Sequence, residues 1–141
     1  MELFFQNLLK KIEEGYDICI GSRLLKESNL KREFYRVIFS KIYNFILIPL
    51  ILPTGVSDAQ CGFKAITPRV AKDILPKLES HNAFLDTELL AVARYKGLKI
   101  AEIPVTWEDK RESRMNVWKD IPNFLKNIVR TRIKIIKGFY D

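Results

Sequence analysis

The sequence predicts an α/β fold, because helical patterns of apolar residues alternate with short apolar runs typical of strands. Apolar side chains recur at helical spacing over residues 3–12, and the pattern stops near Gly15, a residue that often ends helices. A short buried strand is then predicted over 17–20, and alternating apolar residues predict another over 99–105. The chain has 141 residues, 48% hydrophobic and 29% charged, which suits a single domain spanning 1–141.

The remaining elements follow from proline and glycine positions and from helical spacing. Pro49 must bend or end a long helix predicted around it, whereas Pro68 suits the first turn of a helix. In chain order the predictions are a long helix over 32–52, a strand over 62–66, a helix over 68–75, a helix over 86–95 and a basic amphipathic helix over 117–137.

The cysteines and the single histidine give no metal or disulfide pattern. Cys19 and Cys61 are far apart and lack Cys-x-x-Cys or Cys/His spacing. Cys19 lies in an apolar strand and is predicted to be a buried free thiol, whereas the role of Cys61 stays open. His81 has no partner pattern and is predicted to lie in a surface loop.

Positive charge is concentrated near the C-terminus. The formal net charge is +7, and residues 110–137 contain nine lysines and arginines against two acidic residues. Such a segment suits an anionic surface or ligand, for which phospholipid, phosphate and nucleic acid are the candidates. No zinc-finger, homeodomain or RNP-type pattern accompanies the charge, so no nucleic-acid partner is expected.

The uncharged stretch 42–56 is too short and too interrupted by proline to span a bilayer, which takes about 20 apolar residues. It is expected to lie on a membrane or in the core. The N-terminal residues do not resemble a secretory signal, so the expected location is cytoplasmic, peripheral on the cytoplasmic face of a membrane.

Two arginines are candidate phosphate ligands. Arg23 follows Gly21 at the end of a predicted strand, where open α/β sheets bind ligands, and its guanidinium group offers a planar fork to phosphate. Arg36 and Ser40 are four residues apart and would share one helix face, where they could hold one anionic group. Each pattern is also common on ordinary protein surfaces.

The polar loop 57–64 supplies the next candidates. Asp58 and Gln60 offer carboxylate and amide partners for sugar hydroxyls, and Lys64 ends the loop. The alternative is a tight turn in which Asp58 or Ser57 caps the backbone, Gly62 supplies an unusual dihedral angle and Phe63 packs. Asp86 and Glu88 similarly have two interpretations, either as acids beside an acceptor or as charges that stabilise the start of a helix.

Taken together, the segments 20–23, 57–64, 84–90 and 103–107, with Arg36 and Ser40, resemble the C-terminal half of family-2 glycosyltransferases that load a sugar onto a polyisoprenyl phosphate. These are the dolichyl-phosphate glucose and mannose synthases. The resemblance implies a partial glycosyltransferase A-type fold without its N-terminal nucleotide-binding strands.

The resemblance also implies roles for particular residues. Asp86 and Glu88 match the acidic pair beside the acceptor. Ser113 and Arg114 match the basic loop that closes over the site, although the family usually has Gly-Ser-Lys where this chain has Glu112-Ser113-Arg114. A phosphate acceptor is largely dianionic at neutral pH and needs steering more than deprotonation, so general-base chemistry is the less favoured role for the acids.

The family's Asp-x-Asp metal motif does not occur in this sequence. The chain is therefore expected to bind no metal or other cofactor itself, whereas the complete enzyme would use Mg²⁺ or Mn²⁺. Because a transferase stabilises its leaving diphosphate largely through that metal, the chain is expected to be inactive alone, as a truncated or split portion of an enzyme.

The resulting functional hypothesis is inverting transfer of a hexose, glucose in preference to mannose, from a nucleotide sugar to a polyisoprenyl phosphate. The nucleotide sugar would bind only with the missing half, whereas the lipid and the membrane surface are expected partners of this chain. The alternative is a non-catalytic, membrane-peripheral module that binds lipid phosphate or regulates a complete transferase.

Overall fold

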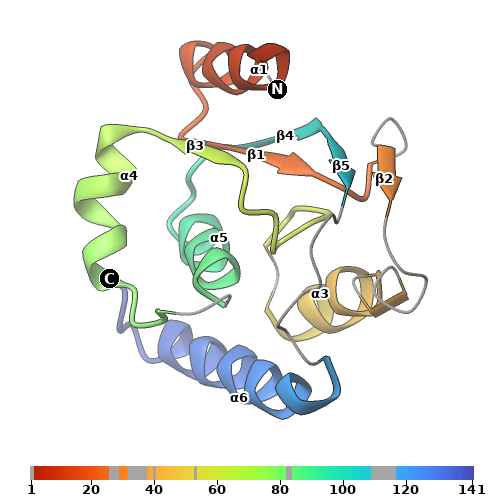
Figure 1. The fold of residues 1–141 in the computed structure, drawn as a ribbon. Helices are drawn as coiled ribbons and strands as arrows, with labels where there is room; N and C mark the ends of the chain where they lie inside the picture. Colours follow the sequence, from red (N-terminus) through yellow and green to blue (C-terminus); the bar gives the residue numbers. More distant parts are fainter. Residues whose placement is uncertain are drawn as a thin grey trace.

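The computed structural model describes residues 2–25, 29–31, 38–39, 41–52, 54–81, 84–108 and 117–141. Its centre is a three-stranded sheet in which β1 (Ile18–Ser22) lies between β3 (Lys64–Ile66) and β4 (Ile100–Pro104) (Figure 1). β4 runs parallel to β1, whereas β3 runs antiparallel and pairs Lys64 with Ile20. A smaller parallel pair is formed by β2 (Asn29–Lys31) and β5 (Thr106–Glu108).

Helices cover both faces of the central sheet. Helix α1 (Glu2–Glu13) lies on one face, whereas α5 (Leu85–Tyr95) and α6 (Val117–Ile136) lie on the other. Successive residues of β1 point to opposite faces, so Cys19 packs with Leu8 of α1, and its neighbours in the strand join the larger core. The strand is buried along its whole length, as expected for a strand covered on both sides.

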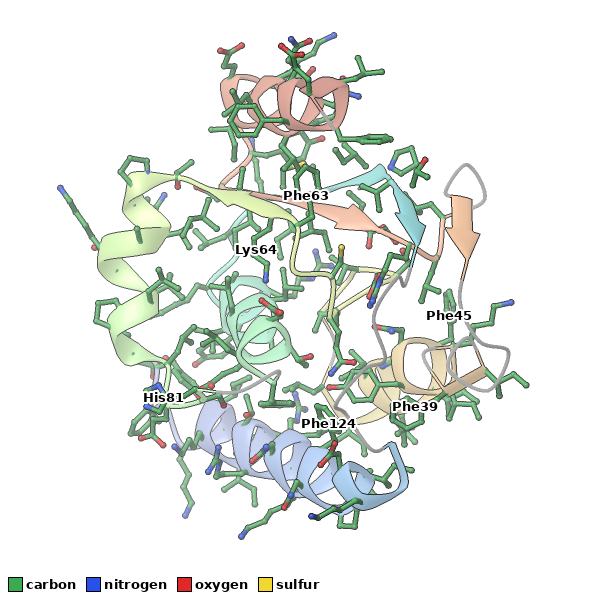
Figure 2. All side chains as sticks on the ribbon, in the orientation of Figure 1. Phe39, Phe45, Phe63, Lys64, His81 and Phe124 are labelled. Carbon is green, nitrogen blue, oxygen red and sulfur yellow. The ribbon has the colours of Figure 1, made fainter. Side chains whose placement is uncertain are left out.

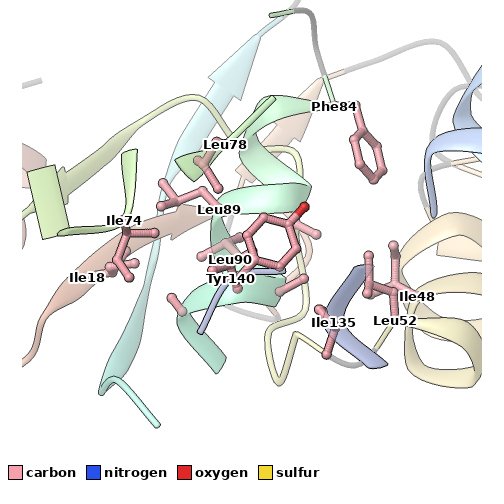
Figure 3. Packing of buried hydrophobic residues seen from close by; sticks show 14 of the residues in the cluster. Ile18, Ile48, Leu52, Ile74, Leu78, Phe84, Leu89, Leu90, Ile135 and Tyr140 are labelled. Atoms are coloured by element: carbon pink, nitrogen blue, oxygen red, sulfur yellow. The ribbon is translucent and has the colours of Figure 1, made fainter. Parts of the chain in front are cut away.

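The larger core is closed by the C-terminal segment. Tyr140 is fully buried after the end of α6 and packs among Leu89, Leu90 and Ile135 (Figure 3). On the same side, α4 (Pro68–Asp73) begins at Thr67, whose hydroxyl accepts a hydrogen bond from the Val70 amide. A short 3-10 helix, η2 (Leu75–Lys77), follows α4.

The apolar segment 41–52 differs from the single bent helix predicted over 32–52. A π-helical turn, η1 (Tyr43–Leu47), precedes α3 (Ile48–Ile51), and the Ile48 amide donates to the carbonyl of Tyr43, five residues back. Pro49 has no amide hydrogen to continue an α-helical ladder, which favours an irregular turn at this point. Residues 32–37 of the predicted helix lie outside the described chain.

The α/β class is confirmed, and apart from the helix predicted over 32–52, each predicted helix and strand is present on described residues within a few positions of its expected ends. Cys19 is buried as a free thiol, Cys61 is also buried and free, and His81 is exposed, as predicted. The suggested unusual dihedral angle at Gly62 is wrong, because the glycines with positive φ are Gly15, Gly55, Gly97 and Gly138. Within the described ranges, no helix is both long and apolar enough to cross a bilayer.

Candidate functional site

Polar side chains gather at the carboxyl end of β1, where Arg23 and Asp58 form a bidentate ion pair. Arg23 Nε lies 2.7 Å from Asp58 Oδ2, and Arg23 Nη2 lies 2.8 Å from Asp58 Oδ1. The Arg23 amide also donates to Oδ2 at 3.1 Å. The side chain of Asp58 is fully buried and that of Arg23 is 11% exposed, so the carboxylate is neutralised by a cation at the border with solvent. The sequence predicted separate phosphate and sugar roles for two residues that here contact each other.

A second hydrogen-bonded group fixes the start of the same loop to the sheet. Ser57 donates through its hydroxyl, 3.1 Å from each carboxylate oxygen of Glu102 on β4, and through its amide to the same carboxylate. Since the Ser57 hydroxyl hydrogen is used there, Ser22 donates its own to Ser57 across 2.8 Å. Sequence reasoning missed Ser57 and Glu102 as site residues, because Glu102 has the ordinary spacing of an outward-facing strand residue.

Lys64 and Asp86, predicted separately, form an ion pair between the start of β3 and the first turn of α5. Figure 2 shows Lys64 reaching from β3 towards that helix. Burial lowers the pKa of Lys64 to about 8, while the neighbouring Cys61 and Asp58 oppose this shift. Burial also raises the pKa of Cys61, which keeps the thiol protonated and unreactive. The pair therefore places a cation and a carboxylate next to the Asp58 loop.

Gln60 combines a main-chain contact with an unused donor. Its amide lies 3.3 Å from Asp58 Oδ1, which helps to close the turn. Its side-chain nitrogen, Nε2, is buried and has no hydrogen-bond partner among the residues that the structure describes. A buried donor of this kind is costly unless something accepts its hydrogen bond, so this position suits a ligand hydroxyl.

Glu88 occupies a different environment from Asp86, although only Thr87 separates the two in the sequence. Its fully buried carboxylate accepts hydrogen bonds from the Glu79 amide at 3.1 Å, the Ser80 amide at 2.9 Å and the Tyr140 hydroxyl at 2.8 Å. These contacts account for Glu88 as a residue that joins α5 to the C-terminal segment. Its catalytic role stays a prediction that the described contacts do not support.

Four other predicted ligands, Arg36, Ser40, Ser113 and Arg114, lie outside the described residues and stay predictions. Within the described ranges, no group of three or more His, Cys, Asp or Glu side chains is placed to hold a metal ion. The structure adds Asn44, which accepts a hydrogen bond from the Ala59 amide at 2.7 Å. The sequence signal for it was a polar residue that interrupts an uncharged, apolar run.

No family model matches this sequence. Curated proteins do match most of its length. It is 33% identical to glycosyltransferase AglD of Haloferax volcanii over 127 residues, which is 89% of this chain and 20% of the relative. It is 33% identical to the dolichyl-phosphate beta-glucosyltransferase of Dictyostelium discoideum over 140 residues, covering 96% of this chain and 42% of that protein.

The human dolichyl-phosphate beta-glucosyltransferase is 30% identical over 142 residues, covering 92% of this chain and 44% of the relative. The chain thus spans less than half the length of the curated relatives it matches. The family resemblance inferred from the sequence motifs is confirmed, and along about nine tenths of its length this chain is similar to one portion of the dolichyl-phosphate beta-glucosyltransferases.

Proposed function

We propose that this chain is the acceptor-side portion of a glycosyltransferase A-type enzyme that transfers glucose from a nucleotide sugar to a polyisoprenyl phosphate. The observation that carries the proposal is the similarity to dolichyl-phosphate beta-glucosyltransferases over 92–96% of this chain. The polar cluster at the end of β1 supports it. There, Asp58, Gln60 and Lys64 lie in one loop, as a site for a polar ligand requires.

In the proposed reaction a phosphate oxygen of the lipid attacks the anomeric carbon of glucose. A carbon–oxygen bond forms on one side while the bond to the nucleoside diphosphate breaks on the other, so the configuration inverts. A phosphate monoester has a second pKa of about 6 and is already mostly dianionic at neutral pH, so the attacking oxygen needs no general base. The protein's main task is to hold the two reactants in line.

In this proposal, some of the described side chains bind the sugar and others supply charge beside the reacting phosphates. Gln60 would donate its unused Nε2 hydrogen to a sugar hydroxyl, and Asp58, held in place by its bidentate contact with Arg23, would accept from another. Lys64, paired with Asp86, would add positive charge beside the reacting phosphates. Arg36, Ser40, Ser113 and Arg114 complete the proposal as ligands of the acceptor phosphate.

The donor side of the reaction belongs to the longer enzyme in this proposal. Mg²⁺ or Mn²⁺ would stabilise the negative charge that develops on the departing diphosphate. The proposal assigns the residues that would hold this ion to the longer enzyme.

The proposed lipid-facing surface combines two neighbouring elements. The segment that contains η1 and α3 exposes Phe45, Ile46 and Leu50 by 53%, 57% and 78%, although its other face is buried. It packs against α6 through an edge-on contact between Tyr43 and Phe124, whose ring centroids lie 5.8 Å apart. This surface suits the apolar tail of a polyisoprenyl lipid.

Helix α6 adds positive charge to that surface. Its exposed apolar residues, Leu125, Val129, Ile133 and Ile136, alternate with Lys126, Arg130 and Arg132, and Lys137 follows the end of the helix. Apolar and basic side chains in this arrangement favour an anionic bilayer surface, because each basic residue near such a surface contributes about 1 kcal/mol. This surface supports our proposal that the protein lies peripherally on the cytoplasmic face of a membrane.

A chimera tests the proposed function. The segment of the Dictyostelium discoideum relative that matches this chain would be replaced by this chain, and glucose transfer from UDP-glucose to dolichyl phosphate would be measured. We expect transfer by the chimera and a loss of about 100-fold on Asp58→Asn, the scale for removing one key polar contact. A folded chimera that binds both substrates but transfers no glucose would refute the assignment.

The second candidate is a non-catalytic module that binds lipid phosphate at the membrane, favoured by the exposed apolar and basic surface of α6. It predicts vesicle binding by this chain and an inactive chimera. It also predicts that Asp58→Asn leaves vesicle binding unchanged, since Asp58 is buried away from that surface.

A further inference from the structure

The π-helical turn η1 places two consecutive polar side chains inside the protein. Tyr43 and Asn44 are 1% and 2% exposed, whereas the next two residues, Phe45 and Ile46, are more than half exposed. A π-helical turn holds one more residue than an α-helical turn, and such turns occur frequently at functional sites. This turn therefore gives the apolar segment an inner polar face and an outer apolar face within four residues.

The inner face holds the Asp58 loop by its main chain. Asn44 Oδ1 accepts a hydrogen bond of 2.7 Å from the amide of Ala59, which is fully buried between Asp58 and Gln60 in sequence. The carbonyl of Ala59 accepts a hydrogen bond of 3.3 Å from the Thr87 hydroxyl. Both main-chain polar groups of this residue are thus bonded to side chains from other segments, so the position of the loop depends on those side chains.

Tyr43 completes the connection. Its hydroxyl lies 3.1 Å from Thr87 Oγ1, and because the Thr87 hydrogen is donated to Ala59, Tyr43 must be the donor in this pair. The same turn therefore reaches both the amide and, through Thr87, the carbonyl of Ala59. Thr87 lies next to Asp86, the partner of Lys64, so the network also borders that ion pair.

We infer that Asn44 is a positioning residue, through which a lipid bound to the outer face of η1 and α3 sets the geometry of the Asp58–Gln60 loop. The inference rests on the proposed function. Shifting the π-helical turn to α-helical register would rotate the following residues by about 100°, the rotation per residue of an α-helix. The inner polar face and the outer apolar face would then no longer be aligned with their present surroundings. Lipid contacts made by Phe45, Ile46 and Leu50 in the present register would favour it and so keep Asn44 against Ala59.

The test measures hydrogen–deuterium exchange of residues 57–61 in the 141-residue chain. The probes are phosphatidylcholine vesicles with polyisoprenyl phosphate, and matched vesicles with the unphosphorylated polyisoprenol. In the wild type we expect the first vesicles to slow exchange of this loop at least threefold. In Asn44→Leu the basal exchange of the Ala59 amide should rise about tenfold or more, the effect of one unmade buried hydrogen bond.

The variant should bind the same vesicles as tightly as the wild type, because Asn44 is not on the outer face, but its loop should no longer respond. Thr87→Val, which keeps the shape and removes the hydroxyl, gives an independent second variant and should also lose the response. Asn44→Asp retains an acceptor for Ala59 and should keep it. Leu50→Ser, on the outer face, should show the opposite pattern of normal basal exchange and weaker vesicle binding.

Vesicle binding without slower loop exchange in the wild type, or equal slowing in wild type and Asn44→Leu, would overturn the inference and leave the proposed function standing. Failure of the wild type to bind either kind of vesicle would overturn both. Equal slowing of loop exchange by polyisoprenyl phosphate and polyisoprenol would support the inference and assign the effect to the apolar tail.

Discussion

Two fully buried carboxylates, Asp58 and Glu88, both accept main-chain hydrogen bonds but differ in their side-chain partners. Asp58 accepts from the Arg23 and Gln60 amides and pairs with the guanidinium group of Arg23, whose side chain is still 11% exposed. Glu88 lies in the larger core and receives hydrogen bonds from two main-chain amides and from the Tyr140 hydroxyl. One carboxylate thus has a charged partner near solvent, whereas the other has only neutral donors among these contacts, two main-chain amides and a tyrosine hydroxyl.

This difference separates a ligand-binding arrangement from a structural one. A side-chain cation at the solvent border can shift towards an incoming phosphate, whereas the amides of Glu79 and Ser80 cannot move without unfolding their segment. The sequence alone did not separate a site acid from a structural one at the start of α5, because Asp86 and Glu88 lie in the same first turn. The contrast therefore predicts which acids tolerate paired replacement and which do not.

The largest expected effect is on the Arg23–Asp58 pair. Arg23→Met leaves a buried carboxylate without its cation, which should lower the free energy of unfolding by about 3–5 kcal/mol in urea denaturation. The double variant Arg23→Met/Asp58→Asn should recover most of this loss, because no unpaired charge remains and the amide oxygen still accepts hydrogen bonds from the loop. A double variant as unstable as Arg23→Met would show that the guanidinium group stabilises the fold by packing and not by charge.

Glu88 should behave differently on paired replacement. Glu88→Leu leaves two amides and a hydroxyl without acceptors and should cost about 3 kcal/mol in the free energy of unfolding. Adding Tyr140→Phe should not restore stability, since the amides of Glu79 and Ser80 stay unpaired. As a control, Glu79→Gln removes a partly exposed ion pair with Lys134 and should change stability by about 1 kcal/mol or less. If the Glu88→Leu/Tyr140→Phe double variant regained stability, Glu88 would respond to paired replacement in the same way as Asp58, contrary to this prediction.

The pH dependence of stability in acid should test the hydrogen-bonded environment of Glu88. Burial opposes ionisation of Glu88, but the hydrogen bonds from Ser80, Glu79 and Tyr140 outweigh it and lower the pKa of this carboxyl below its usual value. A group whose pKa is lower in the folded state stabilises the fold above its unfolded pKa, about 4.3, and loses this contribution as the pH falls through the folded pKa. Thermal unfolding of Glu88→Gln should therefore depend less on pH below about 4.5 than that of the wild type. Parallel curves for the two proteins would contradict this.

Much of the fold was predictable because it depends on local signals. The stop at Gly15, the proline at the start of α4 and the apolar spacing of α6 each specify an element without long-range information. The short strands β2 and β5 were missed, since three residues carry too little periodicity to be recognised.

The site was predictable as a set of segments but not as a set of contacts. The motifs brought Arg23, Asp58, Lys64 and Asp86 to attention, yet which of them pair depends on the sheet register and on the placement of α5, neither of which has a local signature. The same limit explains why Ser57, Glu102 and Asn44 were missed. Their partners lie 45, 45 and 15 residues away in sequence.

The smallest expected effect concerns Gly21 of β1, which packs closely against Val105 and Phe63. A Cβ atom on Gly21 would lie 2.7 Å from Val105 Cγ1 and 3.2 Å from Phe63 Cδ1, whereas one on Gly62 would meet nothing within 4 Å. Gly21→Ala should therefore cost about 1 kcal/mol of unfolding free energy, the lower end for overpacking, and Gly62→Ala, the matched control, close to none. Because Gly21 also donates to the Phe63 carbonyl at 2.7 Å, the strain should spread to Arg23 and its partner but not to Glu88. Hydrogen exchange should then accelerate in the loop 57–61 and stay unchanged at the Glu79 and Ser80 amides, and equal acceleration at both places would show that the two carboxylates belong to one cooperative unit.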